Sequence, residues 1–193
     1  MNTKIFCFLA GLFCTVGVLP VAEAHTLGAD DAGLFAGLTH PLVGIDHLLA
    51  MIAVGIWAGQ LGGKAVWRVP LAFLCAMVLG SSLGLLGLSL PMVEPVIASS
   101  VLVLGLIIAG SVQLSMLAVT GVVGFFALFH GVAHGLELPH TASPILYGIG
   151  FVLATSLLHG LGIGFARGSS QYQLIQRLLG FTLIAASTML LTP

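Results

Sequence analysis

The sequence predicts an all-α integral membrane protein: a compact bundle of six transmembrane helices that follows a cleaved signal peptide, with both ends of the mature chain in the periplasm. Composition places the chain in the membrane, because 59% of its 193 residues are hydrophobic and only 6% are charged, whereas a soluble domain has about 25% charged residues. Disordered chains are rich in charge, and nucleic-acid-binding domains are strongly basic. With a net charge of −1, this chain fits neither class.

The N-terminus has the three parts of a secretory signal peptide. Lys4 provides the positive charge, residues 5–18 form the apolar core, and Ala-Glu-Ala at 22–24 matches a cleavage site. An uncleaved first transmembrane helix is the alternative, but the apolar core is shorter than the roughly 20 residues that a membrane span needs. We therefore expect a signal peptide over residues 1–24 and one six-span membrane domain over residues 25–193.

Uncharged runs between the few charged residues predict where the chain crosses the membrane. The longest run, residues 95–136, has room for two helices of about 20 residues, and each of the other runs holds one. The six expected spans are residues 41–61, 67–89, 94–112, 115–136, 143–165 and 173–192.

The charges in the loops predict the orientation of the bundle. A signal peptide places residue 25 outside the cytoplasmic membrane, so the loops at residues 62–68 and 166–177 should face the cytoplasm. These two loops contain every Lys and Arg of the mature chain, as the positive-inside rule requires. We therefore expect a multi-pass protein of the cytoplasmic membrane with both mature ends outside.

Pairs of glycines four residues apart recur in four of the predicted spans. Such pairs let transmembrane helices approach one another closely, so we expect them to pack the bundle. They are Gly55 and Gly59, Gly80 and Gly84, Gly131 and Gly135, and Gly160 and Gly164.

A first cluster of ionisable residues lies at the outer entrance of the first predicted span, where burying such groups in the membrane is costly and needs an explanation. It runs from His40 to His47, with Asp46 beside His47 and Met51 one helical turn further on. Pro41 suits the first turn of a helix, so we expect the helix to begin there. His47 and Met51 would then share one helix face.

A second cluster lies at the end of the fourth predicted span. His130 and His134 are four residues apart, and Glu137 continues the same helix face seven residues after His130. This span should run from inside to outside, so the cluster lies at its outer, carboxyl end. The dipole of a helix favours a cation at that end.

Alternation of the spans brings both clusters to the outer side of the membrane. Histidines that only hydrogen-bond neighbouring helices, and a buried Asp46–His47 pair, are the simpler explanations, but the coincidence of two clusters favours a shared cation site. Nitrogen and oxygen ligands together suit nickel, cobalt, zinc or copper(II) better than magnesium or calcium. The candidate metal ligands are His40, Asp46, His47, His130, His134 and Glu137.

Three further residues are candidates for the path of the ion. His25 would begin the mature chain, where its α-amine and imidazole could chelate a metal, or it simply follows the cleavage site. Met51 is either a ligand or a core residue. His159 lies about two-thirds of the way inward in the fifth predicted span, and is either the next stop below the metal site or a residue that packs within the bundle.

The stretch His40–Ala58, HPLVGIDHLLAMIAVGIWA, closely resembles the signature of the HupE/UreJ family, and FHGVAHGLE at 129–137 resembles its later motif. The resemblance covers the whole chain. Members are bacterial inner-membrane permeases associated with nickel supply for hydrogenase and urease, some with cobalt uptake. The resemblance implies that the six candidate ligands are the family's metal-handling positions. The chain is also similar to a broader nickel–cobalt transporter signature, but five residues instead of four separate His40 from Asp46, so that similarity stays an analogy.

The resemblance implies secondary uptake of nickel, with cobalt next, and a functional link to nickel enzymes such as hydrogenase or urease. The chain has no phosphate-binding glycine-rich loop followed by Lys and Ser or Thr, so we do not expect ATP to drive it. The expected partners are the divalent metal ion, as transported substrate, and the lipid bilayer. We expect no cofactor and no nucleic acid, and a homo-oligomer stays open.

Two other classes of protein are alternatives. A haem-binding or metalloenzyme-accessory membrane protein is the first alternative, and haem binding would use pairs of histidines that face one another at membrane depth. An intramembrane metallohydrolase would need a glutamate directly after the first histidine of the His130–His134 pair, where this chain has Gly131. We therefore do not expect an enzyme.

Overall fold

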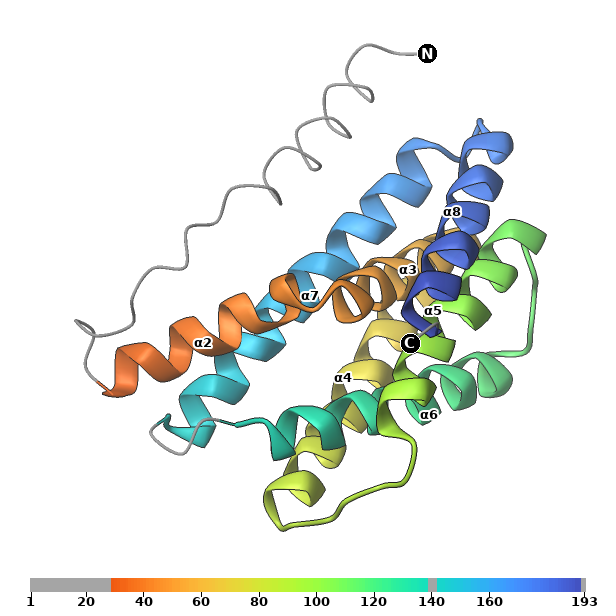
Figure 1. The fold of residues 1–193 in the computed structure, drawn as a ribbon. Coiled ribbons are helices and arrows are strands. Elements are labelled where there is room, and N and C mark those ends of the chain that lie inside the picture. Colours follow the sequence, from red (N-terminus) through yellow and green to blue (C-terminus); the bar gives the residue numbers. More distant parts are fainter. Residues whose placement is uncertain (1–28, 139–141, 192–193) are drawn as a thin grey trace.

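The computed structural model describes residues 29–138 and 142–191, and within these ranges the chain forms seven α-helices and no strand (Figure 1). The predicted signal peptide and His25 lie outside the described residues. In chain order the helices are α2 (Ala29–Val43), α3 (Ile45–Leu61), α4 (Ala65–Leu85), α5 (Val93–Gly110), α6 (Met116–Leu136), α7 (Pro144–Gly168) and α8 (Gln173–Leu191).

Five of these helices, α4 to α8, are long and apolar enough to cross a membrane. Helices α2 and α3 meet the same criterion when they are taken together as one bent span. The described chain is therefore an all-helical, multi-pass membrane protein. Five of the six predicted spans are confirmed as single long apolar helices.

The prediction that the first span begins as a helix at Pro41 is wrong. Helix α2 already starts at Ala29 and contains Pro41 in its last turn. The chain then bends by 81° at Gly44 before α3 begins at Ile45. Proline lacks an N–H and crowds the carbonyl of the preceding turn, which weakens the helix around it. The extended backbone of Gly44, with φ −75° and ψ 109°, completes the break.

The helices pack mainly in pairs: α4 against α6, α5 against α8, and α7 against both α2 and α3 (Figure 1). Glycines make the α4–α6 contact close. A Cβ atom on Gly84 would lie 2.6 Å from the carbonyl oxygen of Val132, and one on Gly131 would collide with the backbone of Met77. Any larger residue would push these helices apart, which confirms the packing role predicted for the glycine pairs of both helices.

The prediction that Gly160 and Gly164 pack α7 against its neighbours is wrong. A Cβ atom on Gly160 or Gly164 would have nothing within 4 Å, whereas one on Gly162 would lie 2.8 Å from the backbone nitrogen of Ile56 in α3. Residues two apart in a helix are separated by about 200° around its axis, so Gly160 and Gly162 lie on nearly opposite faces. The face that α7 turns toward α3 is the one with Gly162.

Helices α4 and α6 run in the same direction, because Gly80 lies against the backbone of Leu128 and Gly84 against that of Val132. Both therefore end at the same end of the bundle. The histidines of α6 lie toward this end, and the break between α2 and α3 brings the first ionisable cluster to them.

Candidate metal site

Four histidine rings meet where the end of α2, the start of α3 and the end of α6 come together. The centroid of the His134 ring lies 4.7 Å from that of His40 and 4.5 Å from that of His47. The His47 ring in turn lies 4.9 Å from that of His130. The two clusters that are separate in the sequence thus form one contiguous group, which we call the histidine group: His40, His47, His130 and His134.

The break at Gly44 is what brings the first two histidines together. Residues seven positions apart in a straight helix are separated by about 10.5 Å along its axis, but the ring centroids of His40 and His47 are 6.2 Å apart. A Cβ atom on Gly44 would lie 2.9 Å from Nδ1 of His47 and 3.1 Å from Oδ1 of Asp46. Glycine at this position therefore leaves room for both side chains.

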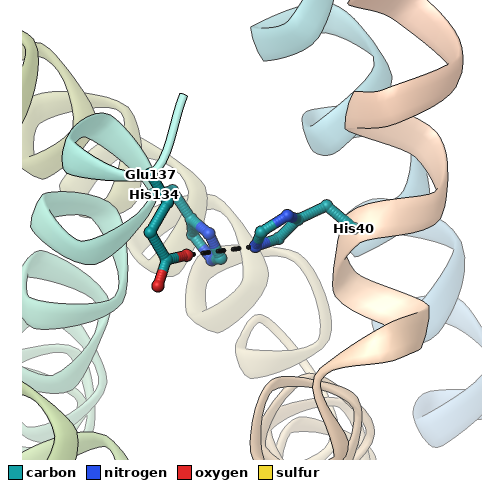
Figure 2. A group of neighbouring side chains, drawn as sticks. All are labelled: His40, His134 and Glu137. Atoms are coloured by element: carbon teal, nitrogen blue, oxygen red, sulfur yellow. Dashed lines mark ion pairs between the residues drawn. The ribbon is translucent and has the colours of Figure 1, made fainter. Parts of the chain in front are cut away.

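His40, His134 and Glu137 can each direct one ligand atom toward a common point, with these atoms all within 4.8 Å of one another (Figure 2). Nε2 of His40 lies 3.4 Å from Oε2 of Glu137. Ligands bound at about 2.1 Å from a metal are at most about 4.2 Å apart, so a small closure would bring the three onto one ion. His134 is buried, but the side chains of His40 and Glu137 are 32% and 49% exposed, which leaves the trio accessible from outside the bundle.

Hydrogen bonds orient the two other histidines of the group. Oδ1 of Asp46 accepts one bond from the backbone N–H of His47 and one from its Nδ1, both 2.8 Å long. Nδ1 of His130 donates to the carbonyl of Phe126 at 3.0 Å. Since these oxygens only accept, Nδ1 carries the proton in both rings and Nε2 keeps its lone pair. Acceptors of this kind orient metal-binding histidines in many proteins.

The free nitrogens of the group have no partner among the described residues. Nε2 of His47, Nε2 of His130 and both ring nitrogens of His134 are buried without a hydrogen bond there. A buried polar group left unpaired costs about 1–3 kcal/mol, so the chain keeps these nitrogens at a real expense in stability. Imidazole nitrogens together with the Glu137 carboxylate are suited to a divalent transition metal.

His159 of α7 lies deeper in the bundle. It is buried, and neither of its ring nitrogens has a partner in the part of the chain that the structure describes. The ring of Phe73 in α4 lies edge-on to it, with centroids 5.1 Å apart, and is 5.9 Å from the ring of His130. Phe73 therefore connects the histidine group to His159. Met51, the other predicted path residue in this region, is fully buried in the hydrophobic core.

Two aromatic residues of α7 border the site and were missed by the sequence analysis. The ring of Tyr147 lies 5.9 Å from that of His40, and the ring of Phe151 lies 4.1 Å from that of His134. Tyr147 and Phe151 are four residues apart, so they lie one above the other on one face of α7. This aromatic pair at helical spacing is the signal that could have revealed them.

Comparison with known proteins shows to which family the chain belongs. The family model described as "HupE / UreJ protein" matches residues 13–190. The chain is similar to "Protein HupE" of Rhizobium leguminosarum bv. viciae, with 47% identity over 173 residues that cover 89% of this chain and 90% of that protein. No solved structure matches the chain. Both the motifs around the histidine group and the length of these matches lead to one conclusion: the chain belongs to the HupE/UreJ family.

Proposed function

We propose that the chain is a secondary permease that takes up a divalent transition metal across the bacterial inner membrane, with nickel as its main substrate and cobalt as the second. The observation that carries this proposal is the histidine group, whose buried nitrogens have no partner among the described residues. Ligand chemistry alone would favour copper over nickel. The choice of nickel, and the supply of nickel enzymes such as hydrogenase or urease, rest on family membership.

Capture begins at the part of the site that solvent reaches. The half-buried side chain of His40 and the exposed side chain of Glu137 first contact the ion, and the buried His134 completes a three-ligand site. No positively charged side chain is needed to balance this site, because the ion itself neutralises the Glu137 carboxylate. Capture of this kind replaces water of hydration by protein ligands one at a time.

The ion then moves inward by exchange of ligands. The ring of His47 lies next to that of His134, and the ring of His130 lies next to that of His47. An ion can therefore gain one histidine before it leaves another. His159 is the next nitrogen donor, and the ion reaches it only when the side chain of Phe73 moves aside.

The membrane potential is sufficient to drive this uptake. Moving a divalent cation inward across 100 mV, inside negative, yields about 2 × 2.3 kcal/mol, or about 4.6 kcal/mol. Since about 1.4 kcal/mol corresponds to a factor of ten, this supports roughly a thousandfold accumulation. ATP hydrolysis is not required.

A haem-binding protein fits the site less well. Bis-histidine ligation requires a slot for the macrocycle between two facing imidazoles. The ring of His134 instead packs against His40, His47 and Phe151, with centroids 4.1–4.7 Å apart. These described side chains leave no such slot.

Metal uptake by cells that express the chain tests the proposal. Nickel, cobalt, zinc and copper are compared in wild type, His47→Ala and His134→Ala, with the amount of inserted protein measured by immunoblot. We expect nickel and cobalt to accumulate and each histidine variant to lose this uptake. Leu157→Ala, which changes an exposed residue of α7, is the control and should keep it. Normal uptake in either histidine variant would refute the proposed site.

His159 is tested separately, because it should act after capture. His159→Ala is expected to slow uptake several-fold while metal binding to the purified protein keeps its wild-type affinity. An unchanged uptake rate would remove His159 from the path.

A further inference from the structure

A cavity of about 130 Å³ lies between α4, α6 and α7, beside the histidine group. Leu85, Leu138 and Pro144 line it where α4 and α6 end and α7 begins. His134 and Tyr147 also line it. The cavity therefore extends from the end of the bundle to one ligand of the capture site.

Tyr147, which lines this cavity, has a hydroxyl that the described residues do not explain. Tyr147 is 5% exposed, and its hydroxyl oxygen is buried with no hydrogen-bond partner among the described residues. The ring stacks on Phe151 and lies edge-on to His40. Packing alone would be served equally well by phenylalanine, so the hydroxyl needs a partner that is not a described side chain.

A metal ion bound at the capture site would bring a partner for the Tyr147 hydroxyl. His40, His134 and Glu137 offer one ligand atom each, which leaves at least one coordination position of a bound transition metal open, and water commonly fills an open position. A cavity of about 130 Å³ has room for at least one water molecule. A phenol hydroxyl can both donate to and accept from a water molecule.

We propose that Tyr147 is a positioning residue of the capture site, whose hydroxyl holds a water molecule that remains bound to the captured divalent metal ion in this cavity. The inference rests on the proposed function and deepens it, because it states that the ion is captured while still partly hydrated. The water donates to or accepts from Tyr147 and is lost only when the ion moves on to His47 and His130.

The test uses Co²⁺, whose visible absorption reports the number and geometry of its ligands, added to the purified full-length protein in detergent micelles. Tyr147→Phe removes the hydroxyl and keeps the ring that packs against His40 and Phe151. The chain has two tyrosines, so Tyr172→Phe, at a position 40% exposed beyond the end of α7, is a matched control. His134→Ala is included as a variant that lacks a ligand.

We expect Tyr147→Phe to raise the Kd for Co²⁺ about three- to tenfold, because one hydrogen bond is lost. The variant should also change the position or intensity of the Co²⁺ absorption band. In uptake assays KM should rise while the maximal rate is kept. Tyr172→Phe should match wild type in all three measurements. A purely structural role would lower the melting temperature of Tyr147→Phe and leave the absorption band of the bound ion unchanged.

The outcomes separate this inference from the proposed function. If wild type binds Co²⁺ and His134→Ala does not, but Tyr147→Phe has the wild-type Kd and spectrum, the role of Tyr147 is overturned and the permease proposal stands. If wild type shows no saturable binding, or His134→Ala binds equally well, both are overturned.

Discussion

Replacing Asp46 by asparagine should weaken metal binding without removing a metal ligand. Oδ1 of Asp46 accepts two hydrogen bonds of 2.8 Å from His47, one from the backbone and one from Nδ1. Asparagine keeps the shape of the side chain but loses its charge, and its amide can present an N–H to Nδ1. The proton of the imidazole would then shift to Nε2, the nitrogen that we propose binds the ion.

The size of the effect follows from the bond that changes. A hydrogen bond to a charged group contributes about 1.5–3 kcal/mol, and a neutral one about 0.5–1.5 kcal/mol. The Nδ1 bond alone therefore loses about 1–1.5 kcal/mol, close to a tenfold change in affinity. Loss of the correct tautomer adds to this, and groups that orient metal-binding histidines are typically worth about 10–100-fold in metal affinity. We expect the Kd for Ni²⁺ at the inner position, where His47 is a ligand, to rise by about 10–100-fold, while binding by His40, His134 and Glu137 is unchanged.

Calorimetric titration of Ni²⁺ into the purified protein measures this effect in a double-mutant cycle of Asp46→Asn and His47→Ala. If Asp46 acts only through His47, the double variant should bind like His47→Ala alone, because the capture trio of His40, His134 and Glu137 is left unchanged. Asp31→Asn, the same chemical change in the first turn of α2, is the control. Losses that add in the double variant would show that Asp46 touches the ion itself, and would refute the reasoning.

Three other predictions test the packing of the bundle and the break between α2 and α3. Gly162→Ala should destabilise the protein by about 1–3 kcal/mol, because its Cβ would meet the backbone of α3. Its control, Gly160→Ala, should be neutral or stabilising by up to about 1 kcal/mol. Equal melting temperatures of the two variants in detergent would contradict the packing of Gly162 against α3. Gln176→Leu removes hydrogen bonds to the carbonyl of Ala166 and to the side chains of Ser169 and Gln60. It should lower the free energy of unfolding, measured by SDS titration, by about 2 kcal/mol. An unchanged free energy of unfolding would mean that these hydrogen bonds do not hold the helices together. Gly44→Ala should weaken Ni²⁺ binding about as much as Asp46→Asn does, because its Cβ would crowd the Asp46–His47 pair; wild-type affinity would show that the break tolerates a side chain.

The transmembrane helices could be predicted from the sequence because charged residues interrupt the apolar runs. The break at Gly44 could not. Pro41 fits the first turn of a helix as well as the last turn of a broken one, and the sequence before it is too polar to suggest a span. The close contact of Gly37 with the backbone of Tyr147 holds α2 against α7, and such a tertiary contact is invisible in the local sequence.

The ionisable residues of the candidate site stand out in the sequence, but their arrangement does not. Ionisable groups are rare in this chain, so each one at membrane depth stands out. The hydrogen bond between Asp46 and His47 and the contact between His40 and Glu137 could not be predicted from the sequence pattern. Side-chain rotamers and the angle between helices decide both. The choice between Gly160 and Gly162 failed for the same reason: spacing identifies a face of a helix, and the partner helix decides which face is used.

The pairing of the helices explains why the site lies where it does. Numbered as spans, with α2 and α3 as the first, the first packs on the fifth, the second on the fourth and the third on the sixth. This pattern is the one expected of an inverted repeat in which the first three spans correspond to the last three. Exchanging the two halves turns the pairing of the first and fifth spans into that of the fourth and second. The pairing of the third and sixth spans is left unchanged. The chain thus forms one group of α2, α3 and α7 and another of α4 and α6, each held by close backbone contacts at glycines.

The candidate metal site lies between these two groups, where side chains make the contact. His40 comes from one group and His134 and Glu137 from the other, so an ion bound by all three joins the groups. Phe73 of α4 lies against His159 of α7, across the same boundary. Backbone contacts at glycines resist sliding within a group, whereas rings can exchange rotamers between groups. In the permease that we propose, the ion therefore locks the boundary at its capture site, and passage to His159 requires the boundary to open at Phe73.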